Sequence, residues 1–277
     1  MSNMYIIGKQ VAAMYNNYYD KMANNIAKIS SGNRITCAAD DAAGLSIAEK
    51  MESQMNGTEM AMKNTQDAIS MIQTADGTLD SVTKVLQRMN ELAVQAANGT
   101  NADNDLNALN DEYVALIDQI NQFASDSEFN TIKLFKNDNG DTSNSFHIQT
   151  GPNAGNSLMF SIDVMNSDVL DLTGTDLLSN NNASSAIDTV KKALEKITRS
   201  RSHLGATQNR LEFSYDAQEN YLTNITDSYS RIMDVHIASE ALAMARNATM
   251  ANVNSSLMVQ VNKALQSQVS FIQKMLE

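Results

Sequence analysis

The sequence has few residues that interrupt a helix. Its 277 residues include a single proline, Pro152, eleven glycines and no tryptophan. Proline and glycine are the least favourable residues in a helix interior, whereas alanine, methionine, leucine and glutamine, which are abundant here, favour helices. The composition therefore predicts a mainly α-helical protein.

Positive charge is also scarce. The chain carries 20 Lys and Arg residues against 32 Asp and Glu residues, for a formal net charge of -12. A protein of this charge is repelled by a phosphate backbone. Nucleic acid is therefore not expected as a partner.

Long apolar runs are missing as well. No stretch approaches the 18 or more uncharged apolar residues that indicate a membrane-spanning helix, so no membrane association is expected. The first twenty residues contain Ile6, Ile7 and Val11 but no apolar core behind a basic region, so they do not resemble a secretory signal peptide. Ordinary rules would place such a chain in the cytoplasm.

The residue patterns of common enzymes are not found in the sequence. The three histidines, His147, His203 and His236, are too dispersed to form a His-Glu-x-x-His zinc motif, and there is no Gly-x-Ser-x-Gly elbow or glycine-rich phosphate loop. Cys37 is the only cysteine, which excludes an internal disulfide. The Asp40–Asp41 pair precedes an Ala-rich segment and is expected to cap its helix. We expect no enzymatic activity, catalytic residue, metal or cofactor.

The strongest positive signal is a heptad pattern between residues 187 and 232. A repeat of 3.5 residues keeps one narrow stripe facing a partner over many turns, as in coiled coils. Arg201, Gln208 and Gln218 interrupt this stripe, and we interpret them as positions where the helix also has partners outside its own bundle. The stripe consists of Ile187, Val190, Leu194, Ile197, Arg201, Leu204, Gln208, Leu211, Tyr215, Gln218, Leu222, Ile225, Tyr229 and Ile232.

Three further amphipathic helices precede this one. Apolar residues recur at helical spacing over residues 7–29, 41–98 and 106–123, and the turn at 97–101 would bring the second and third helices together. Between residues 129 and 182 the pattern changes to short alternating runs, one around Phe146 and one around Phe160, which predict β-strands. This stretch is too short to form an independent domain.

Both chain ends have the character of association elements. From Asn247 to Glu277 the only charged residues are Lys263, Lys274 and Glu277, although the helical spacing continues. An isolated helix of this kind is marginal in water, so we expect the terminal helices to become ordered on assembly. The predicted polymerisation stripe comprises Ile7, Val11, Met14, Met258, Val261, Leu265, Val269, Ile272 and Leu276.

Several segments of the chain resemble bacterial flagellin. The N-terminal matches are SSGNRI at 30–35, DDAAGLSI at 40–47, LQRMNELAVQAANGT at 86–100 and FNTIKL at 129–134, and GATQNRLE at 205–212 resembles the family's C-terminal helix. The resemblance covers residues 1–135 and 185–277. It leaves the β-rich middle as a nearly minimal form of the family's variable region.

The resemblance implies a fold and a domain organisation. The fold is a long antiparallel helical rod or coiled-coil bundle with a small central β-hairpin region. Residues 1–40 and 236–277 would form a terminal inner coiled-coil domain, residues 41–135 and 183–235 a helical rod domain, and residues 136–182 a short variable region.

The resemblance also implies a function. Members of the family are structural subunits of the flagellar filament, exported unfolded through the flagellar type III apparatus and polymerised at the distal tip. The implied partners are further copies of the chain, the export machinery, an export chaperone and the filament cap. The implied location is outside the bacterial cell.

Two details of the resemblance concern particular residues. Met233 and His236 stand where the family commonly has polar residues. The segment that the animal Toll-like receptor for flagellin recognises matches at Arg88 and Leu92, with Glu112 at the corresponding acidic position. A solvated ion pair between Arg88 and Glu112 is the alternative interpretation.

Three other classes of protein compete with a filament subunit. A hook-filament junction protein shares the terminal architecture but would not propagate a filament. An inserted metalloprotease would need the histidine motif that is absent. A generic coiled-coil secretion component or adhesin would need only one association element, whereas here both ends require partners.

Overall fold

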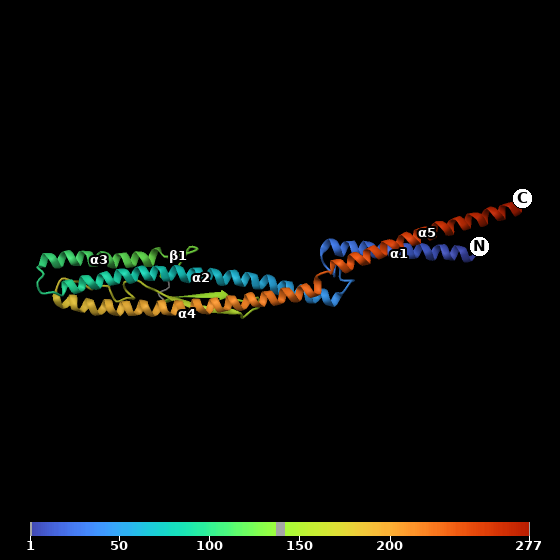
Figure 1. The fold of residues 1–277 in the computed structure, drawn as a ribbon. Coiled ribbons are helices and arrows are strands. Elements are labelled where there is room, and N and C mark those ends of the chain that lie inside the picture. Colours follow the sequence, from blue (N-terminus) through green and yellow to red (C-terminus); the bar gives the residue numbers. More distant parts are fainter. Residues whose placement is uncertain (1, 137–141, 277) are drawn as a thin grey trace. The chain divides into compact units, whose positions relative to one another are not determined.

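The computed structural model describes residues 2–136 and 142–276, and long helices make up most of it (Figure 1). They agree with the helices predicted from the sequence to within a few residues in most cases, and the mainly helical fold class is confirmed. The helices are α1 (Ser2–Ser31), α2 (Ala42–Ala96), α3 (Asp103–Asp126), α4 (Asn180–Met233) and α5 (Ile237–Leu276).

The chain divides into two compact units. The terminal unit comprises residues 1–53 and 224–277, and the bundle unit comprises residues 54–223. The predicted division into an inner domain, a rod domain and a variable region is finer than this and stays a prediction.

In the terminal unit, α1 and α5 lie side by side and run in opposite directions (Figure 1). Ile35, Ala48 and Met233 form a small core in the same unit. The backbone N–H of Val235 donates to the carbonyl of Gly32 at 2.9 Å, and an isolated β-bridge joins Asn33 to Asp234. The segment that follows α1 and the segment that precedes α5 are thus tied to each other.

The beginning of α2 shows how the acidic pair works. The Asp41 carboxylate accepts the backbone N–H of Gly44 at 2.8 Å, which is the bond of a helix N-cap. Asp40 instead accepts the backbone N–H and hydroxyl of Thr36, at 3.0 and 2.9 Å, and these bonds lower the pKa of its carboxyl group. The capping prediction holds for Asp41, while Asp40 closes the preceding turn.

The bundle unit has one continuous hydrophobic core. Apolar side chains from α2, α3 and α4 meet in it, including the fully buried Leu79, Leu86, Tyr113, Ile120 and Val190. The hydroxyl group of Tyr113 lies 3.1 Å from that of Thr175, and burial raises the pKa of the phenol. Helical periodicity therefore located the core correctly.

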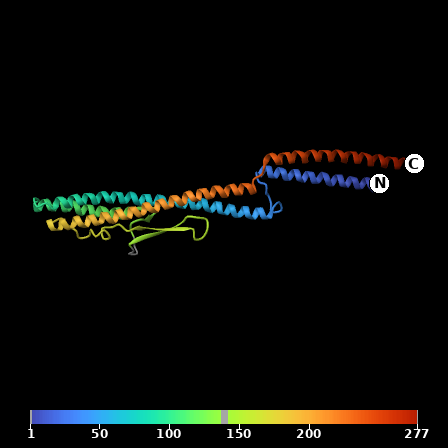
Figure 2. The same ribbon diagram turned by 60° about the horizontal axis from the view of Figure 1, so that its bottom comes forward.

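Two antiparallel hairpins complete the bundle unit. β3 (Ser143–Gln149) pairs with β4 (Ser157–Asp163) in the register Phe146 to Phe160, as the alternating pattern predicts. This hairpin lies along the helices (Figure 2), where Pro152 at its tip meets Gly57 of α2. β1 (Glu128–Phe129) and β2 (Ile132–Lys133) form a second hairpin. Each strand has two residues, too few for the sequence pattern to reveal it. In the part of the chain that is described, no helix could cross a membrane.

Candidate assembly surface

The seam between α1 and α5 is closely packed and partly polar. A Cβ atom on Gly8 would lie 3.6 Å from Cγ1 of Val261, so the backbone of α1 comes close to α5 there. Further along, Asn25 donates to the Glu240 carboxylate, and Asn247 donates to the side-chain oxygen of Asn25 at 2.9 Å. The polar bonds fix the register of the two helices, because a slip of one turn would break both.

The outer faces of the same two helices are strongly apolar. Met14 is 54% exposed and Val269 is 48% exposed, and large apolar side chains line both helices in the same way. Monomeric soluble proteins rarely expose so much apolar surface unless a partner covers it. The other exposed members are Tyr5, Ile6, Ile7, Tyr19, Ile26, Ile237, Leu242, Met250, Val253, Leu257, Val259, Phe271 and Met275.

The predicted polymerisation stripe is divided between the seam and the outer face. Ile7, Met14 and Val269 are exposed, whereas Val11, Met258, Val261 and Leu265 are half-buried. The side chains of Ile272 and Leu276 lie outside the described residues. Val11 lies at helical spacing from Gly8 and Asn25, which both contact α5, and it is half-buried. It therefore lies on the side of α1 that faces α5. The participation of all nine residues in polymerisation stays a prediction.

The sequence reasoning missed most of the outer apolar face. A search for one heptad stripe finds the side of a helix that faces its first partner. Tyr5, Tyr19, Leu242 and Phe271 lie off that stripe, and they are exposed. The low charge of the last thirty residues was the signal that a second apolar face exists.

The polar residues within the α4 heptad serve the subunit itself. Arg201 binds Asp76 and Asp80 of α2, and hydrogen bonding to Asp76 raises the pKa of its guanidinium group. Gln218 is nearly buried and donates to the Thr150 carbonyl at the hairpin tip, and Gln208 donates to Glu212 of its own helix at 2.9 Å. Arg201 and Gln218 therefore have partners within the bundle unit. The expectation that these positions also serve neighbouring subunits stays a prediction.

The residues of the receptor prediction do not form one surface. Arg88 and Glu112 are exposed and bound to each other at 2.8 Å, and this hydrogen bond raises the pKa of Arg88. Arg88 also reaches Glu91 at 3.1 Å. Leu92 is 0% exposed and belongs to the core of the bundle unit. As a direct surface contact, Leu92 is therefore a wrong assignment in this structure, because its side chain is enclosed by the subunit.

The two unusual residues before α5 have structural partners. Met233 is buried with Ile35 and Ala48 in the small core of the terminal unit. His236 stands directly before α5, and its Nδ1 accepts the backbone N–H of Ser239 at 3.3 Å. Met233 fills a core position and His236 caps a helix, which accounts for both departures.

A long helical subunit with a large unpaired apolar face belongs to the class of self-associating structural proteins. Among the described residues, no group of three or more His, Cys, Asp or Glu side chains could hold a metal ion. Comparison with known families then gives the particular assignment. The N-terminal helical region of bacterial flagellin matches residues 3–140, and its C-terminal helical region matches residues 187–272. The chain belongs to the bacterial flagellin family.

Individual relatives agree with this assignment. The chain is 40% identical over 242 residues to a flagellin of Halalkalibacterium halodurans, covering 87% of this chain and 88% of that protein. It is 37% identical over 273 residues to a flagellin of Bacillus subtilis, covering 88% and 90% of the two chains. The family and these relatives indicate a structural protein without enzymatic activity.

A likeness among solved structures concerns the fold alone. A protein from Vibrio parahaemolyticus, provisionally assigned as a flagellar hook-associated protein, superposes with a TM-score of 0.59. The match covers 70% of this chain and 100% of that chain at 13% identity. Such a low identity relates the folds and not the functions.

Proposed function

We propose that this chain is the repeating structural subunit of a bacterial flagellar filament, which works outside the cell. The family and the named relatives support this conclusion. The proposal includes the step that makes the polymer, in which α1 and α5 of many copies bury their outer faces against one another.

The observation that carries the proposal is the apolar outer face of α1 and α5. Fully burying an exposed side chain of this kind contributes about 1.5 to 3 kcal/mol, and burying the exposed half of Met14 or Val269 contributes about half of that. The free subunit leaves many such side chains in water, which favours association of the terminal units. Since an isolated helix pair is weakly stable, the terminal helices are proposed to gain their full order in the polymer.

A seeded growth experiment tests this proposal. Purified full-length protein is added to short filament fragments of itself, and elongation is followed by sedimentation and electron microscopy. We expect long filaments of uniform diameter. Protein that stays in the supernatant at high concentration, with no elongation of the seeds, would contradict a filament function.

The export partners are part of the same proposal. A subunit with so large an apolar face must be kept from associating inside the cell. We therefore propose that it is held by an export chaperone, passes unfolded through the flagellar type III apparatus and is added beneath a filament cap. A co-purification of the chain with such a chaperone from its host, lost on deletion of residues 237–276, would support this route.

The hook-filament junction alternative predicts a different result in the same experiment. A junction protein forms a short ring or collar and does not elongate a seed. The solved structure of a flagellar hook-associated protein resembles this chain in fold alone, whereas the sequence matches are to flagellins. Limited addition of one layer to each seed would favour it.

A second proposed role is recognition by the animal Toll-like receptor for flagellin. The exposed pair of Arg88 and Glu112 supports it, because both charged groups are open to a partner on neighbouring helices of one unit. We propose Arg88 and Glu112 as contacts, with Leu92 acting only through the core beneath them. Unchanged signalling by an Arg88→Ala protein in receptor-expressing cells would contradict this role.

A further inference from the structure

Two helices of the bundle unit carry opposite charge on their outer faces. α3 has six acidic residues and no basic residue over Asp103–Asp126. Residues 191–210 of α4 contain six Lys and Arg residues and one acidic residue, Glu195. In a chain with a net charge of -12, this basic segment is an exception.

Part of the basic charge is neutralised inside the subunit. Arg201 binds Asp76 and Asp80, and Lys196 binds Asp171 at 2.6 Å. Lys191, Lys192, Arg199 and Arg210 are exposed and form no ion pair with any residue that the structure describes. Hydrogen bonding to Lys196 lowers the pKa of the Asp171 carboxyl group, and Lys192 lies close enough to add to this effect but forms no pair with it. The four charges therefore remain unpaired within the described part of the chain.

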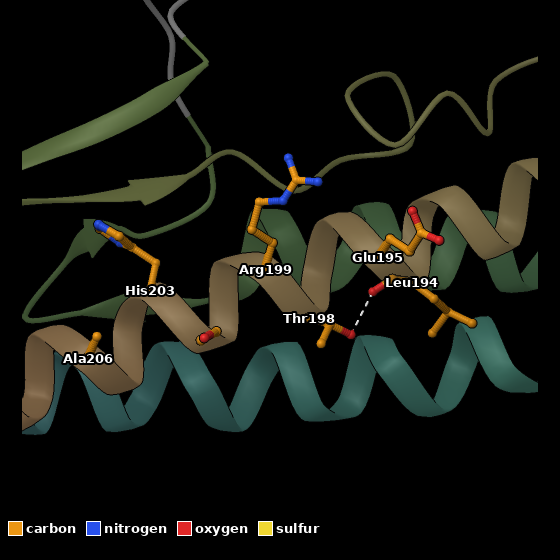
Figure 3. A pocket seen from close by; sticks show the side chains of 7 residues that line it. Leu194, Glu195, Thr198, Arg199, His203 and Ala206 are labelled. Atoms are coloured by element: carbon orange, nitrogen blue, oxygen red, sulfur yellow. Dashed lines mark hydrogen bonds between the residues drawn. The ribbon is translucent and has the colours of Figure 1, made fainter.

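The free cations follow one side of α4. Lys192, Arg199 and Arg210 are exposed at helical spacing, and Phe213 continues the same side and is 74% exposed. Figure 3 shows Arg199 and His203 projecting from α4 on the side away from α2. Leu194, Thr198 and Ala206 belong to the same open surface of α4. We call Lys192, Arg199, Arg210 and Phe213 the basic stripe.

A matching acidic stripe lies on α3. Asp111 and Asp118 are exposed, and neither forms an ion pair within the described part of the chain. Val114, between them on the same side, is 42% exposed. Asp111 and Asp118 are seven residues apart, as are Lys192 and Arg199, so each pair spans about 10.5 Å along its helix axis. We call Asp111, Val114 and Asp118 the acidic stripe.

We propose that the basic stripe of one copy binds the acidic stripe of a neighbouring copy in the filament. The spacing of Lys192 and Arg199 matches that of Asp111 and Asp118, and contact at these charges would also remove the exposed Val114 from water. Aromatic and arginine side chains are the residues most often found at the centres of protein interfaces. The occupant of each stripe is thus a second copy of this chain.

The arrangement also explains why such a contact produces a polymer. The two stripes are complementary to each other and not to themselves, so two copies that bind through them leave one stripe unused on each. A contact of this heterologous kind continues indefinitely when it does not close into a ring. The inference rests on the proposed filament function and names a contact of the bundle unit within it.

Charge reversal tests the contact. Variant A carries Lys192→Glu and Arg199→Glu, and variant B carries Asp111→Lys and Asp118→Lys. Each variant alone has like charges on both stripes. Because electrostatic steering changes association rates by about 10-fold to 1,000-fold, we expect each to elongate wild-type seeds at least about tenfold more slowly than wild type. Thermal unfolding measured by circular dichroism should stay near the wild-type midpoint, since all four sites are exposed.

The decisive arm is an equal mixture of A and B. In the mixture, the acidic α4 of A meets the basic α3 of B, and the basic α4 of B meets the acidic α3 of A. We expect the mixture to elongate seeds at close to the wild-type rate. A control variant with Glu59→Lys and Asp67→Lys adds the same charge as B on exposed positions of α2. It keeps both stripes, so by itself it should elongate seeds at close to the wild-type rate.

Three results would overturn the inference and leave the filament function intact. They are wild-type growth by A and B alone, failure of the A and B mixture to grow, and growth of the control variant as slow as that of B. Failure of the wild-type protein itself to elongate seeds would instead contradict the proposed function.

Discussion

In the bundle unit, Arg201 of α4 binds Asp76 of α2 through both carboxylate oxygens. Nε of Arg201 lies 2.8 Å from Oδ1 of Asp76, and Nη2 lies 3.3 Å from Oδ2. Nη1 also reaches Asp80 at 3.2 Å, one turn further along α2. One side chain therefore fixes the alignment of two long helices at a point where the heptad would otherwise place an apolar residue.

Replacement of Arg201 should reveal the strength of this link. We expect Arg201→Ala to lower the free energy of unfolding by about 1 to 2 kcal/mol, because a planar, two-pronged pair exceeds the 1 kcal/mol typical of surface ion pairs. The stability of Arg201→Lys should fall between those of wild type and Arg201→Ala, since lysine keeps the positive charge and loses the two-pronged guanidinium contact. Urea unfolding of the monomer measures both. If the stability of Arg201→Ala is within about 0.3 kcal/mol of wild type, solvent screens the ion pairs of Arg201 with Asp76 and Asp80 completely.

Two glycines of α2, one in its first turn and one in its interior, permit a test of opposite signs. A Cβ on Gly44 would lie 2.5 Å from Oδ2 of Asp41, while nothing stands within 4 Å of a Cβ on Gly77. We expect Gly77→Ala to stabilise the chain by up to about 1 kcal/mol, the usual gain of alanine over glycine in a helix. Gly44→Ala should destabilise it by about 1 kcal/mol, because it displaces the capping carboxylate. Thermal melts of both variants decide the matter, and a gain in stability at both sites would rule out a functional cap.

Acid should weaken the bundle unit through Asp171. The Lys196 ammonium group donates to this carboxylate and lowers its pKa below the ordinary 3.8. A carboxylate with a depressed folded pKa contributes stability above its unfolded pKa and loses it as the pH falls through the folded pKa. We expect a steady unfolding midpoint from pH 7 down to about 5 and a fall below about pH 4.

Asp171→Asn isolates the contribution of this charge. Asp171 has a positive φ of 59°, a conformation that asparagine also tolerates, so the variant changes the charge and keeps the backbone. Its midpoint should fall less steeply below pH 4 than that of wild type. Parallel curves for the two proteins would place the acid sensitivity elsewhere, for example at Asp80, whose pKa Lys84 lowers.

The proposed receptor site predicts that two nearby substitutions act in different ways. Arg88→Ala removes an exposed charge and should reduce signalling without a measurable change in the melting temperature. Leu92→Ala creates a cavity in the core and should cost about 2 to 5 kcal/mol of stability. Circular dichroism and a cell signalling assay, performed on the same preparations, separate the two effects. A stable Leu92→Ala protein with reduced signalling would reinstate Leu92 as a contact.

The outer face of the terminal unit predicts an assembly defect without a folding defect. Met14→Asp places a charge on an exposed apolar position, so the monomer should melt as wild type does while seeded growth is lost. Asn17→Asp, an exposed polar position on the same helix, is the control and should grow normally. Equal growth of both variants would remove Met14 from the assembly surface.

The long helices could be predicted because a repeated apolar spacing leaves a strong signal over forty or more residues. The buried Leu86 and Val190 follow directly from it. The pairing of Arg201 with Asp76 could not be predicted, because periodicity does not say which two residues of different helices meet. The β1–β2 hairpin was missed because two residues are too few to show an alternation. The burial of Leu92 required the packing around it, since motif similarity does not distinguish surface from core.

The pairing of α1 with α5 sets an order of folding. Asn25 finds its partners Glu240 and Asn247 at sequence separations of 215 and 222 residues, whereas the bundle unit contains its own partners within residues 54–223. Contacts between distant residues form late, because the intervening chain must first be closed into a loop. A chain that emerges from its amino terminus can therefore complete its bundle unit first. The helices with the exposed apolar faces, α1 and α5, then pair last, when the bundle unit has already folded.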